Sequence, residues 1–254
     1  MSDQNTSDRN TSDDNPSDPK RTEVGRRNFL LGAGTAVAAG LAPNTPAQAQ
    51  SKSVAAAAAP GANDEALLTL TSSEAAFFSA AADTMIPADA LTPSGSDCGV
   101  TIFIDRQLAG AWGGGARMYR SGPFQRGKPG QGYQLPLTPR EFFAAGIVAT
   151  NGWTRKTYGK DFDRLTPRER ELAFKELEAG KAALGEFDGK QFFEALLQIT
   201  MEGFFADPIY GGNRNKAAWK MIGYPGLPAL YANSIDEYRH KRYLVDPQSI
   251  VDFS

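Results

Sequence analysis

The sequence predicts a mainly α-helical protein, built as a single irregular helical domain with long aromatic loops. Three segments begin with a Ser/Thr-x-x-Glu capping box, which marks a helix start because side chains there satisfy free backbone amides. Apolar residues recur at helical spacing from residue 192 to 205. Nowhere after residue 50 does the chain show a long alternating strand pattern or a well-flanked hairpin. Helices therefore dominate the expected fold.

The three capping boxes begin at Thr71, Thr138 and Thr166. The last two place a proline at the first helical position, where its missing N–H costs nothing. The first predicted helix carries Phe77 and Phe78 and ends at Pro87. A further helix is expected from Gly99 to Ala111, capped by Asp97, and another from Lys190 to Ala206.

The stretch from Glu202 to Gly226 is the densest run of aromatic, glycine and proline residues. Asp207-Pro208 ends the preceding helix, because a residue before proline is disfavoured in the α region. Gly211-Gly212-Asn213 predicts a tight reversal, since these residue types tolerate positive φ. A short helix bearing Trp219 follows, and Gly223 ends it. We expect Trp219 and Tyr210 to tie the reversal to the helix end at Phe204–Phe205 and to support a partner surface.

The N-terminal 49 residues read as a disordered leader and a signal peptide. Residues 1–20 have almost no apolar groups, so they cannot offset their ordering entropy. The pair Arg26-Arg27, followed by Phe29 and Leu30, opens a short apolar run with the order of a twin-arginine signal. Ala47 and Ala49 offer an A-x-A cleavage site. The apolar run is too short for a membrane anchor, which needs roughly 20 residues, so we favour a cleaved signal.

Three parts of the chain follow from these boundaries. Residues 1–49 form the leader and signal, 50–69 an alanine-rich linker, and 70–254 the helical domain. Residues 112–136 are rich in Gly and Pro and carry Trp112, Tyr119, Phe124 and Tyr133. A loop of that length with aromatic side chains is expected to be docked against something, and together with the glycine-containing block it suggests a large docking surface.

Composition argues against most redox and metal chemistry in this chain. One His and one Cys cannot form a zinc, haem or iron–sulfur site of the usual kinds. A complete G-x-G-x-x-G is missing after the signal, so a flavin-binding turn is not expected. The formal net charge of −2, without a basic face, disfavours nucleic acid as a partner. His240 lies among charged residues and is expected to be a solvated surface histidine.

Two local features leave alternatives open. Asp83, Asp89 and Asp105 either converge into a carboxylate site or serve as caps and solvated acids, and we favour the second. Cys98 lies at a helix start, where a thiolate is favoured. An unpaired Cys in an oxidising compartment is either a buried or free thiol or half of an intersubunit disulfide.

The block GFFADPIYGGNRNKAAWKMIGYPG resembles the signature of the gluconate 2-dehydrogenase subunit 3 family. AADTMIPAD at 81–89 and GVTIFIDRQLAG at 99–110 are similar to the family as well. The resemblance implies a non-catalytic small subunit of a periplasmic, flavin-dependent sugar, polyol or sugar-acid dehydrogenase complex. Alternatives are a periplasmic carboxylate-based enzyme and a free-standing ligand-binding module.

The resemblance also implies the partners and cofactors. The expected partner is an FAD-dependent GMC-type dehydrogenase subunit, with a membrane-bound multihaem cytochrome c as a third subunit. FAD and haem c would then belong to the partners, and this chain would hold no cofactor. Arg26 and Arg27 would lead the flavoprotein through the twin-arginine translocase to the periplasm, peripheral to the inner membrane. The residues expected at the partner interface, or in its structural support, are Tyr210, Gly211, Gly212, Trp219 and Cys98.

Overall fold

A computed structural model describes residues 65–125, 127–128, 130–227 and 230–253. All of the described residues belong to one compact unit of the chain. The predictions for the leader, the export signal and its cleavage site lie outside the described residues: Arg26, Arg27, Phe29, Leu30, Ala47 and Ala49.

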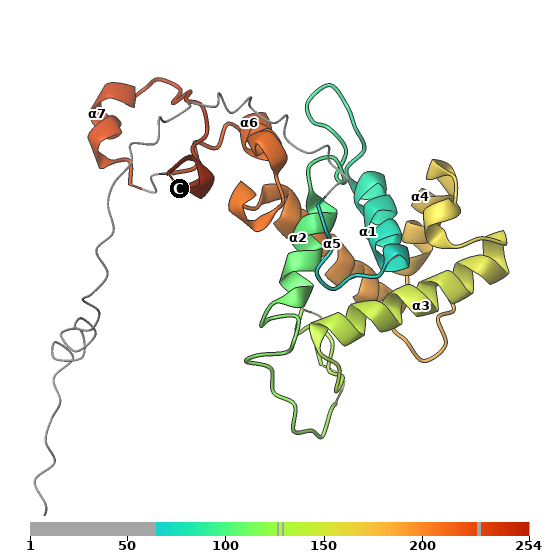
Figure 1. Ribbon diagram of the computed structural model, residues 1–254. Helices are drawn as coiled ribbons and strands as arrows, with labels where there is room; N and C mark the ends of the chain where they lie inside the picture. Colours follow the sequence, from blue (N-terminus) through green and yellow to red (C-terminus); the bar gives the residue numbers. More distant parts are fainter. Residues whose placement is uncertain (1–64, 126, 129, 228–229, 254) are drawn as a thin grey trace, which may run out of the picture. The chain divides into compact units, whose positions relative to one another are not determined.

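The described residues form helices without a β-strand, which confirms the mainly α prediction. Figure 1 shows their arrangement. The helices are α1 (Ser72–Met85), α2 (Val100–Ala109), α3 (Pro139–Tyr158), α4 (Pro167–Glu178), α5 (Gly189–Phe205), α6 (Ala217–Ile222) and α7 (Ile235–Tyr238). Five 3₁₀ turns separate or extend them: η1 (Phe162–Arg164), η2 (Pro208–Tyr210), η3 (Arg214–Lys216), η4 (Ala232–Ser234) and η5 (Ile250–Phe253).

All three predicted capping boxes are present. Thr71, Thr138 and Thr166 each accept a hydrogen bond from the backbone N–H three residues later, and the glutamate there returns one. Because each box is complete within four residues, the sequence alone fixes these helix starts.

The start of α2 differs from the prediction. Asp97 does not cap this helix; its carboxylate accepts from the Ser94 hydroxyl at 3.0 Å instead. The N-cap is Gly99, at φ 83°, and the helix runs from Val100 to Ala109. A Cβ at Gly99 would lie 2.3 Å from the carbonyl oxygen of Gly211. The close approach of the Gly211 backbone therefore requires a glycine at the N-cap residue of α2.

The core lies where α5 packs against α2, α3 and α4, with α1 against α2 and α4. Its centre is aromatic: the Phe77 ring lies 4.9 Å from that of Phe162 and 6.2 Å from that of Phe192, and all three side chains are fully buried. Gly146 on α3 admits the Phe192 ring, since a Cβ there would lie 2.2 Å from it. Volume complementarity between phenylalanines and one glycine thus joins α1, α3 and α5.

The aromatic loop of residues 112–136 docks through one side chain. Tyr133 stacks on Phe142 with ring centroids 4.0 Å apart. Burial there raises the pKa of Tyr133 to about 12. Trp112 and Tyr119 are 45% and 76% exposed, and Phe124 is exposed as well. Docking is confirmed for Tyr133, and for the three exposed aromatic residues it stays a prediction.

Among the described residues, no helix combines the length and the apolar character that a membrane crossing requires.

Candidate docking surface

The three carboxylates that were considered as a possible active site do not converge. Asp105 is buried on α2 and accepts backbone N–H groups from Leu68, Thr69 and Leu70 at 2.6–2.9 Å. These amides lie at the junction of the predicted linker and the helical domain, which Asp105 therefore fastens to α2. A carboxylate with three backbone donors acts as a structural cap.

Asp83 and Asp89 cap other segments. Asp83 accepts from the backbone N–H and the hydroxyl of Ser96, at 2.8 and 3.0 Å. Asp89 accepts from the N–H groups of Leu91 and Thr92, and these bonds lower its pKa, that from Thr92 most. The described residues contain no group of three His, Cys, Asp or Glu side chains that could hold a metal ion. The expectation that these acids serve as caps is confirmed.

Cys98 is a buried, free thiol. Its Sγ lies 3.7 Å from the carbonyl oxygen of Pro93. Burial, reinforced by the charge of Asp97, raises the pKa of Cys98 to about 11. The expectation of a favoured thiolate at this helix start is therefore wrong, because desolvation outweighs the helix terminus. Of the two alternatives, the structure has the buried thiol, and its side chain is only 1% exposed.

His240 is exposed, as predicted, and its backbone has a φ of 71°.

The predicted reversal is built by three residues with different roles. Gly211 has a φ of 96°, which favours glycine. Gly212 does not have positive φ; it is needed because a Cβ would lie 2.0 Å from the carbonyl oxygen of Gly203 on α5. Asn213 is fully buried at φ 45°. The prediction of positive φ thus holds at Gly211 and Asn213 and is wrong at Gly212.

The Asn213 side chain joins the two helices that flank the reversal. Its Nδ2 donates to the carbonyl of Ala206 at 3.0 Å, and its Oδ1 accepts from the N–H of Ala218 at 2.9 Å. These bonds satisfy an orphan carbonyl after α5 and an orphan amide at the start of α6. The sequence indicated a turn at Asn213, but nothing in it identified this central hydrogen-bonding role.

Trp219 and Tyr210 have different environments. The Trp219 indole is 7% exposed and donates from Nε1 to the carbonyl of Phe205 at 2.9 Å. Trp219 therefore ties α6 to the end of α5. Tyr210, on η2, is 52% exposed. It is available at the surface, where Trp219 is not.

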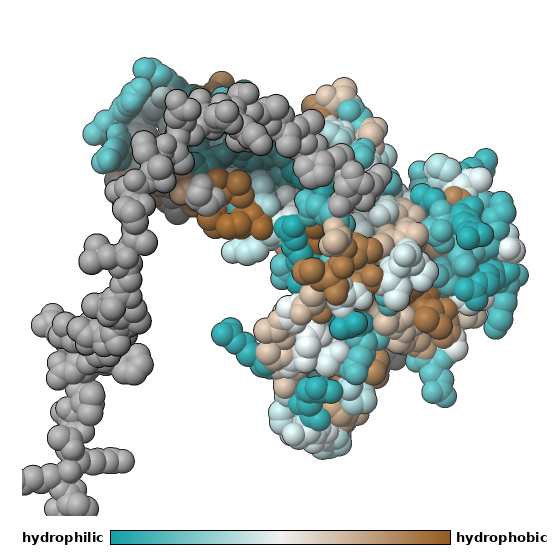
Figure 2. Space-filling view, in the orientation of Figure 1, coloured by the Kyte–Doolittle hydropathy of each residue, from teal (hydrophilic) through white to brown (hydrophobic). Residues whose placement is uncertain are grey.

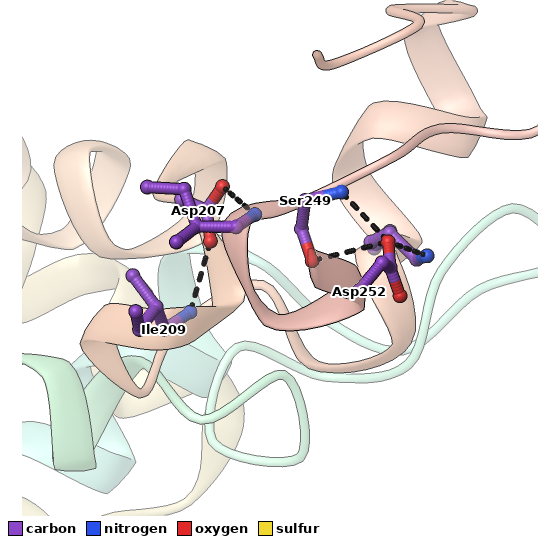
Figure 3. Close-up of polar contacts among 6 residues, drawn as sticks. Asp207, Ile209, Ser249 and Asp252 are labelled. Carbon is purple, nitrogen blue, oxygen red and sulfur yellow. Dashed lines mark hydrogen bonds and ion pairs between the residues drawn. The ribbon is translucent and has the colours of Figure 1, made fainter. Parts of the chain in front are cut away.

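A pair of aspartates fastens the C-terminal turn η5 to this region (Figure 3). Asp207 accepts from the N–H groups of Ile209 and Ile250, each at 3.0 Å. Asp252 accepts from the N–H of Ser249 at 2.7 Å and from the Lys216 ammonium at 2.8 Å. No local pattern predicts this Asp207–Asp252 latch, because its two long-range bonds join residues that are 43 and 36 positions apart.

Glu65 makes a second long-range link. Its carboxylate lies 2.7 Å from the Arg106 guanidinium on α2 and 3.3 Å from that of Arg214 on η3. The segment before α1, α2 and the reversal are thereby held together by one carboxylate. Because these ion pairs are partly exposed, they contribute little to the free energy of unfolding. We assign them the role of positioning the segments that they join.

Several apolar side chains of η2, α6 and the residues after α6 are exposed on this braced frame. The docking surface, as we define it, consists of Ile209, Tyr210, Met221, Ile222 and Tyr224, which are 38–57% exposed. By contrast, the surface over α4 is mainly hydrophilic (Figure 2). Apolar groups held on a rigid frame and left open to solvent are typical of protein–protein interfaces.

Comparison with known proteins agrees with this description. No curated protein and no solved structure matches the chain. The family model described as Gluconate 2-dehydrogenase subunit 3 matches residues 72–226, from the first residue of α1 to the glycine that follows the docking surface. The chain belongs to the gluconate 2-dehydrogenase subunit 3 family and is an accessory subunit of a dehydrogenase complex.

Proposed function

We propose that this chain is the non-catalytic small subunit of a periplasmic, FAD-dependent dehydrogenase that oxidises a sugar, polyol or sugar acid. It serves export and stabilisation of the flavoprotein subunit. The single observation that carries the proposal is the docking surface, an exposed apolar patch on a frame braced by Asn213, Trp219 and the Asp207–Asp252 latch. A rigid patch of this kind suits a permanent protein partner.

The partners supply the redox chemistry in this proposal. FAD belongs to the GMC-type dehydrogenase subunit, and haem c to a membrane-bound multihaem cytochrome subunit. In this chain the candidate acids cap backbone amides, and Cys98 is a buried thiol with a raised pKa. These roles leave none of them free for proton transfer, which disfavours the alternative of a carboxylate-based enzyme.

Tyr210→Ala tests the docking role. Tyr210 is half exposed, so the isolated variant should keep its circular dichroism, while affinity for the co-expressed flavoprotein falls about tenfold or more. Tyr119→Ala is the matched control, because Tyr119 is 76% exposed in the aromatic loop. A folded Tyr210→Ala chain that binds the flavoprotein as tightly as wild type would contradict this role.

Export is proposed to depend on Arg26 and Arg27. Replacing both with lysine should leave this chain and the flavoprotein in the cytoplasm, since the translocase recognises the arginine pair. The measurement is dehydrogenase activity in periplasmic and cytoplasmic fractions. Normal periplasmic activity in the double variant would overturn the export role without touching the docking role.

A further inference from the structure

The segment from residue 230 to 247, which we call the C-terminal arm, lies beyond the family match and is packed unlike the rest of the protein. Between residues 230 and 246 no side chain is fully buried. Leu230 and Leu244 are 78% and 68% exposed, and Ile235 is 58% exposed. Apolar side chains left open to solvent along one segment are typical of a binding surface.

Both ends of the arm are nevertheless fixed. The N–H of Leu227 donates to the carbonyl of Gln248 at 2.8 Å, and the N–H of Gln248 donates to that of Pro225 at 3.0 Å. Gly226 permits this contact, since a Cβ there would lie 2.0 Å from the Gln248 oxygen. Just beyond Gln248, the Asp207–Asp252 latch holds η5. The arm is therefore presented on the same frame as the docking surface.

The arm and Tyr224-Pro225 enclose an open groove of about 650 Å³. The groove is lined by four tyrosines: Tyr224, Tyr231, Tyr238 and Tyr243. Tyr243 packs edge-on against Tyr231 and Tyr238, with centroids 5.9 and 4.7 Å apart. The Tyr231 hydroxyl donates to the carbonyl of Gly226 at 3.1 Å. Interlocked rings lose little entropy on binding, which is why tyrosines dominate binding hot spots.

Charge on the arm indicates the chemistry of the occupant. Arg239, His240, Lys241 and Arg242 form a consecutive exposed run, and Arg239 and His240 line the groove. Arg239 also pairs with Asp236 at 2.9 Å. A groove with tyrosine walls and a basic rim is complementary to an extended segment that carries carboxylates. Asp236 and Glu237 on α7 are exposed as well, so the excess positive charge is confined to residues 239–242.

We propose that this tyrosine groove binds an extended acidic segment of the flavoprotein subunit. The inference rests on the proposed function and extends it, because Tyr224 belongs both to the docking surface and to the groove. The flavoprotein would thus contact one continuous strip, of which the family-matched residues form one part and the arm the other.

The test uses the full chain and the co-expressed flavoprotein subunit. Tyr238→Ala combined with Tyr243→Ala should weaken the complex at least about tenfold, through faster dissociation. Lys241→Glu combined with Arg242→Glu should slow association, and the wild-type association rate should fall as salt rises. Tyr119→Ala and Lys175→Glu, at exposed positions on the aromatic loop and α4, are the controls and should change neither rate.

The outcomes separate this inference from the proposed function. A complex that forms normally with all the arm variants would overturn the groove assignment and leave the proposed function standing. No complex with the wild-type chain would overturn the proposed function itself. Concentration-dependent self-association of the isolated chain that the tyrosine variants abolish, or tyrosine-dependent binding to phosphatidylglycerol vesicles, would show that a second copy or a membrane occupies the groove and would overturn the proposal.

Discussion

The helical core around Phe192 and the block around Asn213 are held together by different means. In the core, large apolar side chains fill space: Phe77, Phe162 and Phe192 are fully buried, and the Phe77 ring packs against the other two. In the block, backbone segments approach one another closely at glycines. A buried asparagine forms hydrogen bonds with the unpaired backbone groups at two helix ends. The core therefore depends on side-chain volume, and the block depends on backbone geometry and polar satisfaction.

The difference matters for function. The phenylalanines that fill the core are fully buried, so they cannot contact a partner. The block is braced by glycine contacts and hydrogen bonds, so it can leave Ile209, Tyr210 and Ile222 open to solvent and still be rigid. Pre-organised apolar surface binds with less loss of conformational entropy.

The largest expected effect comes from adding one methyl group to the block. In Gly212→Ala the new Cβ would lie 2.0 Å from the backbone oxygen of Gly203, which cannot move without shifting α5. We expect loss of the cooperative unfolding transition in circular dichroism. Gly152→Ala on α3 is the control, because a Cβ there meets nothing within 4 Å and should stabilise the helix by about 0.5–1 kcal/mol. A folded Gly212→Ala chain of wild-type stability would contradict the close-approach argument.

Phe192→Ala tests the core by removing volume. We expect a loss of about 3–5 kcal/mol in the free energy of unfolding, measured with urea, because the ring is fully buried among other phenylalanines. Leu197→Ala, on the same helix but 39% exposed, should cost less than about 1.5 kcal/mol. Equal losses for the two variants would mean that the centre of the core lies elsewhere.

Asn213 allows the geometric and polar contributions of the block to be separated. Asn213→Ala leaves the Ala206 carbonyl and the Ala218 N–H without their partner and keeps a strained φ, so we expect a loss of about 2–4 kcal/mol. Asn213→Gly loses the same hydrogen bonds but accepts φ 45° readily, and should be about 1 kcal/mol less destabilised. Urea unfolding of both variants measures the difference. If glycine were as harmful as alanine, backbone strain would not matter at this position.

The smallest effect is expected at the latch. The Lys216 hydrogen bond, followed by that from the Ser249 N–H, lowers the pKa of Asp252 below its usual 3.8. A carboxyl whose pKa is lower in the folded than in the unfolded protein stabilises the fold at pH values above its unfolded-state pKa. This contribution is lost as the pH falls through the folded-state pKa. The protection factors of the η5 amides, which correct for the intrinsic pH dependence of hydrogen exchange, should therefore fall at low pH.

Asp252→Asn should reproduce that loosening of η5 at neutral pH, with little change in global unfolding. Asp236→Asn is the control, because the Asp236 side chain is 94% exposed. Unchanged exchange in the Asp252 variant would show that η5 is held by other contacts.

The sequence alone determined the helices whose signals are local. The capping boxes at Thr71, Thr138 and Thr166 are complete within four residues, and Asp207-Pro208 and Gly223 end their helices through their own backbone preferences. The aromatic, glycine-rich block was recognisable for the same reason, since its residues are contiguous in the chain.

Only the tertiary structure decided which distant groups meet. The N-cap at Gly99 depends on Gly211, the role of Asp105 on amides about 35 residues away, and the Asp207–Asp252 latch on residues 36–43 apart in sequence. The local sequence around a carboxylate or a glycine does not identify a partner that is remote in the chain. Which groups form hydrogen bonds or approach closely is determined only when the helices pack. Secondary structure was thus set by local preferences, and the braced frame that presents the docking surface was set by packing.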